Sequence, residues 1–487
     1  MNVTTSNPPK ENNSFKNNLI QSFYIVGFSP DDFFKIDKKE KKGTFMNIFV
    51  DNPEKELNIK PKLITKFPNT KMCVNTIPEQ IIVDHCFPNG KVEITKYKEK
   101  ESFQFSLDNI SQNYEDDFKS LYSKIYFSCL IIKEPLINYF KYKKEIINSV
   151  LQNNSYTLLD TDRNQPLDIN DEIKYSELYI PKIICFASVL PFYNELKLLL
   201  EYVYDYYLSQ KNFANLPLEK VIEKIIVKIP IPINSGEDLI INFDTDNFKQ
   251  KIVFPQNILS EIGIQYYANV SLVPIFQYFS VDEVIRIFKY ILYEIPILFF
   301  SDDKSICSLF VNIFLTLLTP FKYVFPHISI LPKKLYGLIG TEKNYIFGIN
   351  ELYQESFFET NNIELTKNII IISVDFNKNP QVKIEEKIYV KNNEKKIYII
   401  TDSISKTKDD TININGVITP ILNVDIPYIF KKKLSDGINK YLSFMKKKFM
   451  FSKKEPIPTD FTFKIQKVFY KFFVEILEGY TDFFLKS

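Results

Sequence analysis

The hydrophobic pattern along the chain is clearest between residues 278 and 349. Over 281–292, apolar residues recur at three- and four-residue steps, which is the spacing of an amphipathic helix with a wide buried face. Ser280 stands before this run and Glu283 follows three residues later, so the sequence predicts a capping box. The segment therefore opens with a capped helix that buries one face.

The next elements predict an α/β core. An apolar run over 295–300 stops at the polar residues 301–303, which is typical of a buried strand ending in a turn. A second helix is predicted over 305–318, because Pro320 cannot continue it. Prolines and a glycine then punctuate the chain before another apolar strand. This alternation of helices and buried strands indicates the α/β class.

The same patterns predict the elements elsewhere. Strands are predicted over 23–28, 44–50, 92–97, 102–107, 122–130, 179–188, 239–243, 252–255 and 369–375, and helices over 192–208, 218–226, 427–445 and 463–484. Residues up to Cys86 and Phe87 are predicted as a buried strand end that enters a Pro-Asn-Gly turn. In the last helix, Val468, Phe469, Phe472, Phe473, Ile476 and Leu477 are predicted to share one apolar face.

Composition places the chain among ordinary globular proteins. Its 487 residues suffice for two or three domains, with 45% apolar and 25% charged residues. The net charge is only +2, so there is no overall electrostatic demand for a nucleic acid partner. Five dispersed cysteines without a C-x-x-C pair are typical of thiols in a reducing compartment, which predicts a cytoplasmic protein. The apolar runs are shorter than the roughly 20 residues of a transmembrane helix.

No catalytic constellation can be recognised. The two histidines, His85 and His327, lack a nucleophile at a known spacing, and His85 is interpreted as a structural residue. Neither a P-loop nor a G-x-G-x-x-G string occurs among the 11 glycines. Asp302 and Asp303 are better explained as a strand-end turn than as metal ligands. We therefore expect no catalytic residue, no cofactor and no metal.

The strings between 294 and 349 resemble the central segment of DENN domains. The matching strings are Glu294 before a buried strand ending at Ser301, Pro320-Phe321, Ile328-Ser-Ile-Leu331-Pro332 and Tyr345-Ile-Phe-Gly348-Ile349. Tyr323 stands where that family usually has tryptophan, and His327 changes its I-P-I spelling. Upstream, His85-Cys86-Phe87-Pro88-Asn89-Gly90 resembles the family string F-C-F-P-x-G, and Phe103-Gln-Phe105-Ser-Leu107 resembles its F-x-F-x-L strand. At the other end, Gly479-Tyr480-Thr-Asp-Phe483 resembles the close of the downstream module.

This resemblance implies a tripartite organisation. It divides the chain into a disordered tail (1–18), a longin-like uDENN lobe (19–152), a linker (153–175), cDENN (176–350) and dDENN (351–487) with an inserted charged loop near 385–425. The fold expected is α/β: a longin-like N-lobe, a sheet with flanking helices, plus an α/β C-lobe that the C-terminal helices complete.

The resemblance also implies a function. DENN proteins act as guanine-nucleotide exchange factors for Rab-family small GTPases in vesicle trafficking, releasing GDP by binding the switch regions between two lobes. The interface residues expected here are Phe87, Pro88, Asn89, Gly90, Ser301, Asp302, Asp303, Pro326 and His327. Such a protein would be a regulator of a GTPase, without catalytic residues of its own.

Two alternative functions, and one question about membrane contact, stay open at this point. A DENN-fold scaffold would bind a GTPase or a membrane protein without exchange. A GTPase-activating relative would need an arginine finger, and the two arginines are Arg163, in the linker, and Arg286, on an expected exposed helix edge. The lysine runs at 431–433 and 446–448 are either a solvated helix face or a peripheral contact with anionic endomembrane, made by Lys431, Lys432, Lys433, Lys446, Lys447 and Lys448.

Overall fold

A computed structural model describes most of the chain. The described residues are 18–28, 34–37, 42–45, 59–68, 77–96, 100–108, 124–136, 138, 157–158, 177–209, 217–231, 238–245, 248–254, 271–375, 381–391, 396–402, 411–414, 417–420, 426–451 and 459–478. The chain forms two compact units. The N-terminal unit comprises Met1–Ser102 and Ser106–Phe254, and the C-terminal unit comprises Phe103–Phe105 and Pro255–Ser487. Both units combine helices with sheets, so the α/β class is confirmed.

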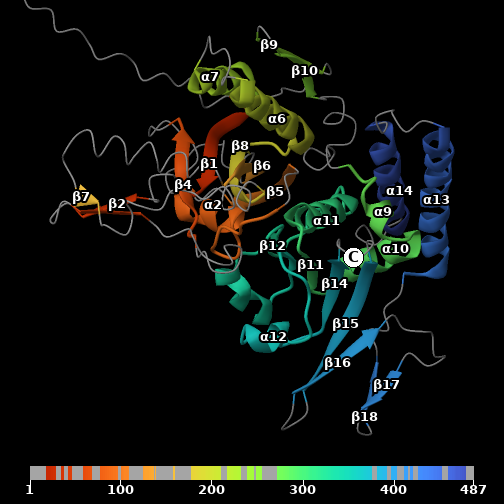
Figure 1. Ribbon diagram of the computed structural model, residues 1–487. Helices are drawn as coiled ribbons and strands as arrows, with labels where there is room; N and C mark the ends of the chain where they lie inside the picture. The colour runs from red at the N-terminus through yellow and green to blue at the C-terminus, as the bar shows by residue number, and fades with distance from the viewer. Residues whose placement is uncertain are drawn as a thin grey trace, which may run out of the picture. The chain divides into compact units, whose positions relative to one another are not determined.

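The N-terminal unit is built on a five-stranded sheet (Figure 1). Its strand order is β4 (Lys62–Phe67), β1 (Ile20–Gly27), β8 (Tyr179–Ser188), β6 (Lys124–Pro135) and β5 (Glu101–Asp108). The central strand, β8, pairs antiparallel with both β1 and β6. Its last six residues are buried, and β1 is buried along nearly its whole length, as apolar strands at the centre of a sheet should be. Beside them, Lys133 on β6 forms an ion pair with Glu101 on β5.

Helices and a hairpin complete this unit. They are α2 (Glu79–Cys86), α6 (Tyr193–Ser209), α7 (Leu218–Lys228) and the hairpin of β9 (Leu239–Thr245) with β10 (Phe248–Phe254); a small sheet joins β2 (Phe34–Asp37), β3 (Lys42–Phe45) and β7 (Thr157–Leu158). Helix α7 buries Val221, Ile222, Ile225 and Ile226, the three- and four-residue spacing of an amphipathic helix. Helix α6 packs against β6, β8 and β10.

Two local predictions for this unit were wrong. Residues 79–86 form helix α2, where a buried strand end was expected, because the apolar pair at 82–83 and the buried pair at 85–86 follow a helical spacing. Residues 92–96 form only isolated bridges, Val92 with Ile59 and Thr95 with Tyr179. The predicted strand over 44–50 is described only as the end of β3, and the rest lies outside the described residues.

The C-terminal unit contains a six-stranded mixed sheet. Its order is β12 (His327–Ile328), β13 (Ile346–Ile349), β11 (Ile297–Ser301), β14 (Ile369–Asp375), β15 (Gln381–Lys391) and β16 (Lys396–Asp402). The first four strands are parallel, and β15 and β16 extend the sheet antiparallel. All five residues of β11 are buried, which explains its unbroken apolar sequence.

The prediction of an inserted charged loop near 385–425 was also wrong in part, because the structure has strands there. Strands β15 and β16, and a hairpin of β17 (Thr411–Ile414) with β18 (Val417–Pro420), occupy much of that range. An antiparallel sheet can leave one face in water, so charged residues within a segment do not exclude a strand. Charge density was therefore a poor guide here.

The helices of this unit largely follow the predictions. They are α9 (Ile275–Tyr278), α10 (Val281–Leu292), α11 (Lys304–Leu317), the 3-10 helix η4 (Lys333–Gly340), α12 (Phe357–Thr360), α13 (Tyr428–Phe451) and α14 (Thr459–Leu477). The capping box of α10 is confirmed: Ser280 Oγ accepts from the Glu283 N–H at 3.3 Å, and the Glu283 carboxylate accepts from the Ser280 N–H at 2.7 Å.

The last helix packs against α10 through aromatic rings. Phe288 lies 4.8 Å from Phe469, 5.6 Å from Phe472 and 5.9 Å from Phe473, measured between ring centroids. The apolar face predicted for α14 does not extend as far as expected, because Ile476 and Leu477 are 47% and 43% exposed. Within the described ranges, no helix combines the length and the apolar character that crossing a bilayer requires.

Candidate functional site

In the N-terminal unit, the predicted interface turn follows directly on α2. Phe87 is 3% exposed and Pro88 is also buried, so both pack in the interior. The Gly90 N–H donates to the Phe87 carbonyl at 2.9 Å, and Gly90 has φ +71, a conformation that favours glycine. Only Asn89 and Gly90 reach the surface, so these two are what the turn can offer to a partner.

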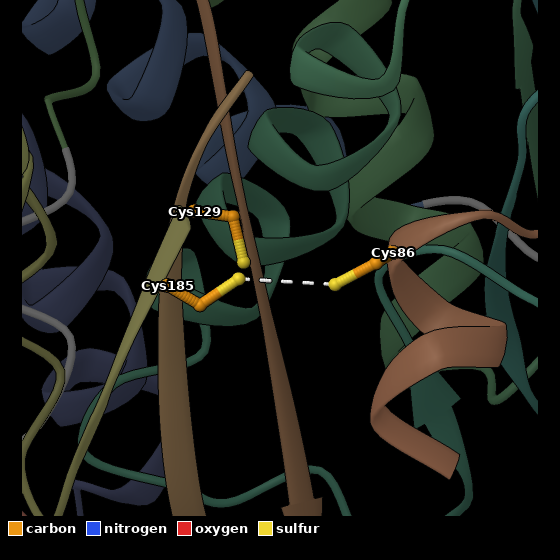
Figure 2. A group of neighbouring side chains, drawn as sticks. All are labelled: Cys86, Cys129 and Cys185. Atoms are coloured by element: carbon orange, nitrogen blue, oxygen red, sulfur yellow. Dashed lines mark hydrogen bonds between the residues drawn. The ribbon is translucent and has the colours of Figure 1, made fainter. Parts of the chain in front are cut away.

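The helix before this turn carries two buried residues with reactive side chains. His85 contacts the Ile81 carbonyl through Nδ1 at 2.9 Å, and burial lowers the pKa of its imidazole. Cys86 contributes its sulfur to a cluster with Cys129 and Cys185, shown in Figure 2. Spacing along the chain gave no sign of this cluster, because its members come from three distant elements. Among the described residues it is the group with metal-ligating potential.

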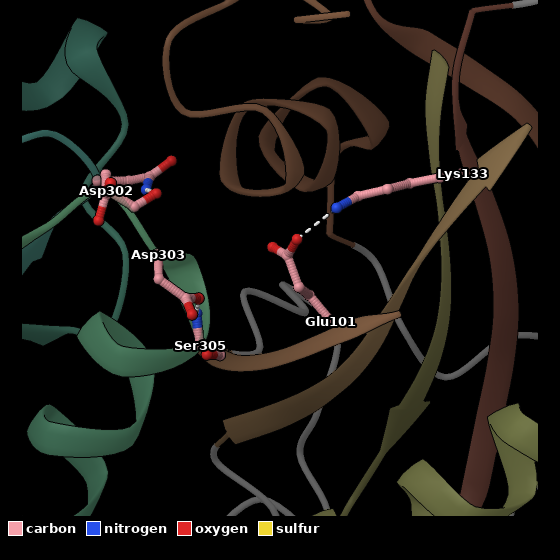
Figure 3. A network of polar contacts seen from close by, with 6 residues as sticks. Glu101, Lys133, Asp302, Asp303 and Ser305 are labelled. Atoms are coloured by element: carbon pink, nitrogen blue, oxygen red, sulfur yellow. Dashed lines mark hydrogen bonds and ion pairs between the residues drawn. The ribbon is translucent and has the colours of Figure 1, made fainter. Parts of the chain in front are cut away.

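In the C-terminal unit, the predicted site residues 301–303 form the turn between β11 and α11, of which Figure 3 labels Asp302 and Asp303. Ser301 is 1% exposed, and its Oγ accepts from the Asp303 N–H at 3.2 Å. The Asp303 carboxylate accepts from the Ser305 N–H at 2.7 Å and so caps α11. Asp302 stands between them, exposed. Two of the three residues thus build the turn, and Asp302 presents a carboxylate at its surface.

The sequence analysis missed a residue that bonds to this turn from another strand. Asn350 follows β13, is 8% exposed, and donates through Nδ2 to the carbonyls of Asp302 at 2.8 Å and Ser301 at 3.3 Å. Strands β11 and β13 are parallel neighbours, so their carboxyl ends lie at one edge of the sheet, the edge where α/β sheets bind ligands. A polar residue directly after an apolar strand was the signal that could have identified it. We call Ser301, Asp302, Asp303 and Asn350 the strand-end cluster.

The strand-end cluster is equipped for binding rather than for covalent chemistry. Cys307 lies beneath it, 0% exposed, with its Sγ donating to the Ile349 carbonyl at 3.2 Å. Burial, and then the nearby Asp303, raise the pKa of the Cys307 thiol, so it stays protonated and is a weak nucleophile. Asp302 is the one residue of the cluster in the exposed class.

The third predicted interface segment, Pro326-His327, lies at the other end of the parallel strands. His327 begins β12 and pairs with Ile346, which is itself in register with Ile297 at the start of β11. His327 is half-buried and contacts the Phe325 carbonyl through Nδ1 at 3.1 Å, while Pro326 is exposed. The fold therefore does not bring Pro326 and His327 together with the strand-end cluster.

The loop around Pro326 nonetheless presents apolar surface. Phe321 is 47% exposed and Val324 87%. Tyr323, between them, is partly buried, and burial together with the Glu294 carboxylate raises the pKa of its hydroxyl. Glu294 is exposed and has φ +58. Aromatic side chains such as Phe321 are enriched in protein interfaces.

The structure describes one of the two arginines considered as arginine fingers. Arg163 lies outside the described residues. Arg286 was expected on an exposed edge, but it is half-buried and its Nε is buried without a hydrogen-bond partner.

The lysine runs lie on α13. Lys432 is exposed, and Lys433, also exposed, forms an ion pair with Glu475 at 2.7 Å. Lys431 is half-exposed, and the side chains of Lys446, Lys447 and Lys448 lie outside the described part of α13.

Comparison with known proteins identifies the family. Residues 179–377 match the family model of the DENN (AEX-3) domain. A curated relative, the DENN domain and WD repeat-containing protein SCD1 of Arabidopsis thaliana, is 25% identical over 211 residues, covering 43% of this chain and 16% of that protein. The chain thus spans less than a fifth of that relative. The matched residues run from β8 past β14 and include both the strand-end cluster and Pro326-His327. The chain therefore contains a DENN domain over residues 179–377.

Proposed function

We propose that this chain is a guanine-nucleotide exchange factor for a Rab-family small GTPase. The observation that carries the proposal is the DENN domain over residues 179–377, a family generally related to Rab exchange. Fold alone does not establish an activity, so the surface of this domain has to supply the mechanism.

Exchange needs no acid, base or nucleophile. The chain would release GDP by binding the switch regions more tightly in the nucleotide-free GTPase than in the GDP-bound one, since only differential affinity shifts such an equilibrium. The exposed Asp302 carboxylate suits that task. A negative charge brought near the nucleotide site repels the phosphates of GDP and competes for Mg²⁺. The buried, protonated Cys307 beneath it agrees with a binding role for the cluster.

The direct test is release of fluorescent GDP from a panel of purified Rab proteins, with and without the chain. Acceleration of release from one or a few Rab proteins supports exchange and identifies the substrate. A well-folded sample that binds a Rab equally in its GDP-bound and nucleotide-free forms, without acceleration, contradicts exchange and favours the scaffold alternative. Acceleration of GTP hydrolysis instead favours the GTPase-activating alternative.

A further inference from the structure

The N-terminal unit contains a cluster of three thiols that the proposed function does not use. Cys86 ends α2, Cys129 lies in β6 and Cys185 in β8, and each side chain is 0% exposed. Their sulfur atoms lie within 4.8 Å of one another, and the sulfurs of Cys86 and Cys185 are 3.8 Å apart. Figure 2 shows the three side chains pointing toward a common point.

The sheet itself brings two of these thiols together. Cys129 and Cys185 are directly opposite in the antiparallel pairing of β6 and β8, so their side chains leave the sheet on the same face. Helix α2 packs against β1, the strand on the other side of β8, and its last residue supplies the third sulfur. The cluster is therefore held by the central strands of the unit and is not a feature of a loop.

The spacing of the sulfurs suits three-coordinate metal binding. A zinc–thiolate bond is about 2.3 Å, and three sulfurs at that distance around an ion in their plane are about 4.0 Å apart. The sulfurs here already lie close to that separation, so an ion could enter with small rotations of the side chains. We propose that Cys86, Cys129 and Cys185 form a binding site for a soft monovalent ion, Cu(I).

The number of ligands favours copper over zinc. Structural zinc is almost always bound by four ligands, whereas thiolates alone are the preferred donors of Cu(I). The described part of the chain supplies three ligand atoms to this cluster. His85 is not a fourth, since the group of ligand atoms that lie within 4.8 Å of one another contains the three sulfurs and neither ring nitrogen of His85. Cys73 lies outside the described residues, and its role can be tested by substitution.

Binding of the ion would be coupled to loss of the thiol protons, because the thiolate is the ligand form of cysteine. Binding would replace thiol protons, which leave to solvent, by Cu(I), and copper would remain in the +1 state. Complete burial is no obstacle for an ion acquired as the chain folds.

The test uses the reduced full-length chain under anaerobic conditions. Cu(I) is titrated from a chromogenic chelator, and the copper retained after desalting is counted. We expect one equivalent, with an X-ray absorption spectrum of the wild-type chain that shows three sulfur neighbours. Copper with fewer than three sulfurs, no retained copper, zinc retained in preference to copper, or a disulfide within the cluster of the reduced native chain would each overturn the proposal.

Variants locate the site. Cys185→Ser should lose the bound equivalent, whereas Cys307→Ser should keep it, because Cys307 is equally buried but bonded to the Ile349 carbonyl in the C-terminal unit. Cys73→Ser should also keep it. If Cys185→Ser does not fold, the wild-type spectrum still decides, since it needs no variant. The measurement involves no GTPase, so its failure is separate from any failure of the exchange assay.

Discussion

Asn350 bonds to the backbone of Asp302: its Nδ2 donates to the Asp302 carbonyl at 2.8 Å. The same amide reaches the Ser301 carbonyl at 3.3 Å, so one side chain joins the carboxyl ends of two parallel strands. The Asp302 carboxylate, which we propose to contact a GTPase, therefore lies on a turn whose backbone is held by the Asn350 side chain. A site on a rigid turn loses little conformational entropy when it binds.

Removing the Asn350 side chain should destabilise the C-terminal unit. Asn350→Ala removes the amide that donates to the buried Ser301 carbonyl and the partly buried Asp302 carbonyl, which costs about 1–3 kcal/mol of unfolding free energy. Denaturant unfolding measures it. Asn439→Ala is the control, because Asn439 is exposed and bonds only the Ser435 hydroxyl, so its effect should stay within about 0.5 kcal/mol. Equal unfolding free energies of the two variants would contradict a stabilising role of the Asn350 hydrogen bonds.

Asp302→Ala should weaken exchange without weakening the fold. We expect the rate of GDP release per unit of GTPase to fall about five- to tenfold, which corresponds to about 1–1.4 kcal/mol. Asp282→Ala is the matched control, since Asp282 is an exposed aspartate in the first turn of α10. Asp282→Ala should leave exchange unchanged. A loss of the same size in both variants would show that Asp302 has no special part.

Gly348 on β13 should not tolerate a side chain. A Cβ at this position would lie 2.1 Å from the Ser329 carbonyl oxygen, which is backbone that has little freedom to move. Gly348→Ala should therefore lower the unfolding free energy by about 1–3 kcal/mol or more. A Cβ at Gly337 in η4 would meet nothing within 4 Å, so Gly337→Ala should be neutral or slightly stabilising. Thermal unfolding of both variants gives the comparison.

Arg286→Met separates exchange from GTPase activation. The methionine keeps the apolar part of a half-buried side chain and removes the guanidinium. If the chain is an exchange factor, GDP release by this variant should match the wild type. If Arg286 were an arginine finger, stimulated GTP hydrolysis would fall about 10³-fold or more. The finding of stimulated hydrolysis that depends on Arg286 would replace the exchange proposal.

The lysines of α13 allow a graded test of contact with anionic membranes. Each lysine near such a surface contributes about 1 kcal/mol, so Lys432→Ala should weaken vesicle binding about fivefold. Lys433→Ala should have a smaller effect, since Glu475 already balances that charge at 2.7 Å. Co-sedimentation with phosphatidylserine vesicles, against neutral vesicles, measures both. Absence of binding to either vesicle would support a solvated lysine face.

The sequence predicted well where local pattern and tertiary environment agree. The apolar period over 281–292, with Ser280 and Glu283, specified α10 together with its capping box, because both are local features. The run before Ser301 specified β11 because parallel strands are buried on both faces. The family strings added what periodicity could not, the identity of a DENN domain.

The failures concern contacts between distant residues. Asn350 reaches Asp302 only because β13 and β11 are neighbours, a pairing that no local pattern encodes. The cluster of Cys86, Cys129 and Cys185 spans three elements in the same way. Phe87 and Pro88 carry a family string and are buried, so a recognisable motif can mark packing rather than an interface.

Strand β8 has a consequence for how the chain is made. It is the middle strand of the N-terminal sheet, between β1 and β6, yet it begins only at Tyr179. A nascent chain that ended before that residue would hold two apolar strands with no strand between them. Domains form during synthesis from the N-terminus onward, but this sheet must wait until β8 leaves the ribosome. A chain truncated before residue 179 should accordingly aggregate. We therefore expect that residues 1–178 do not fold as an independent domain.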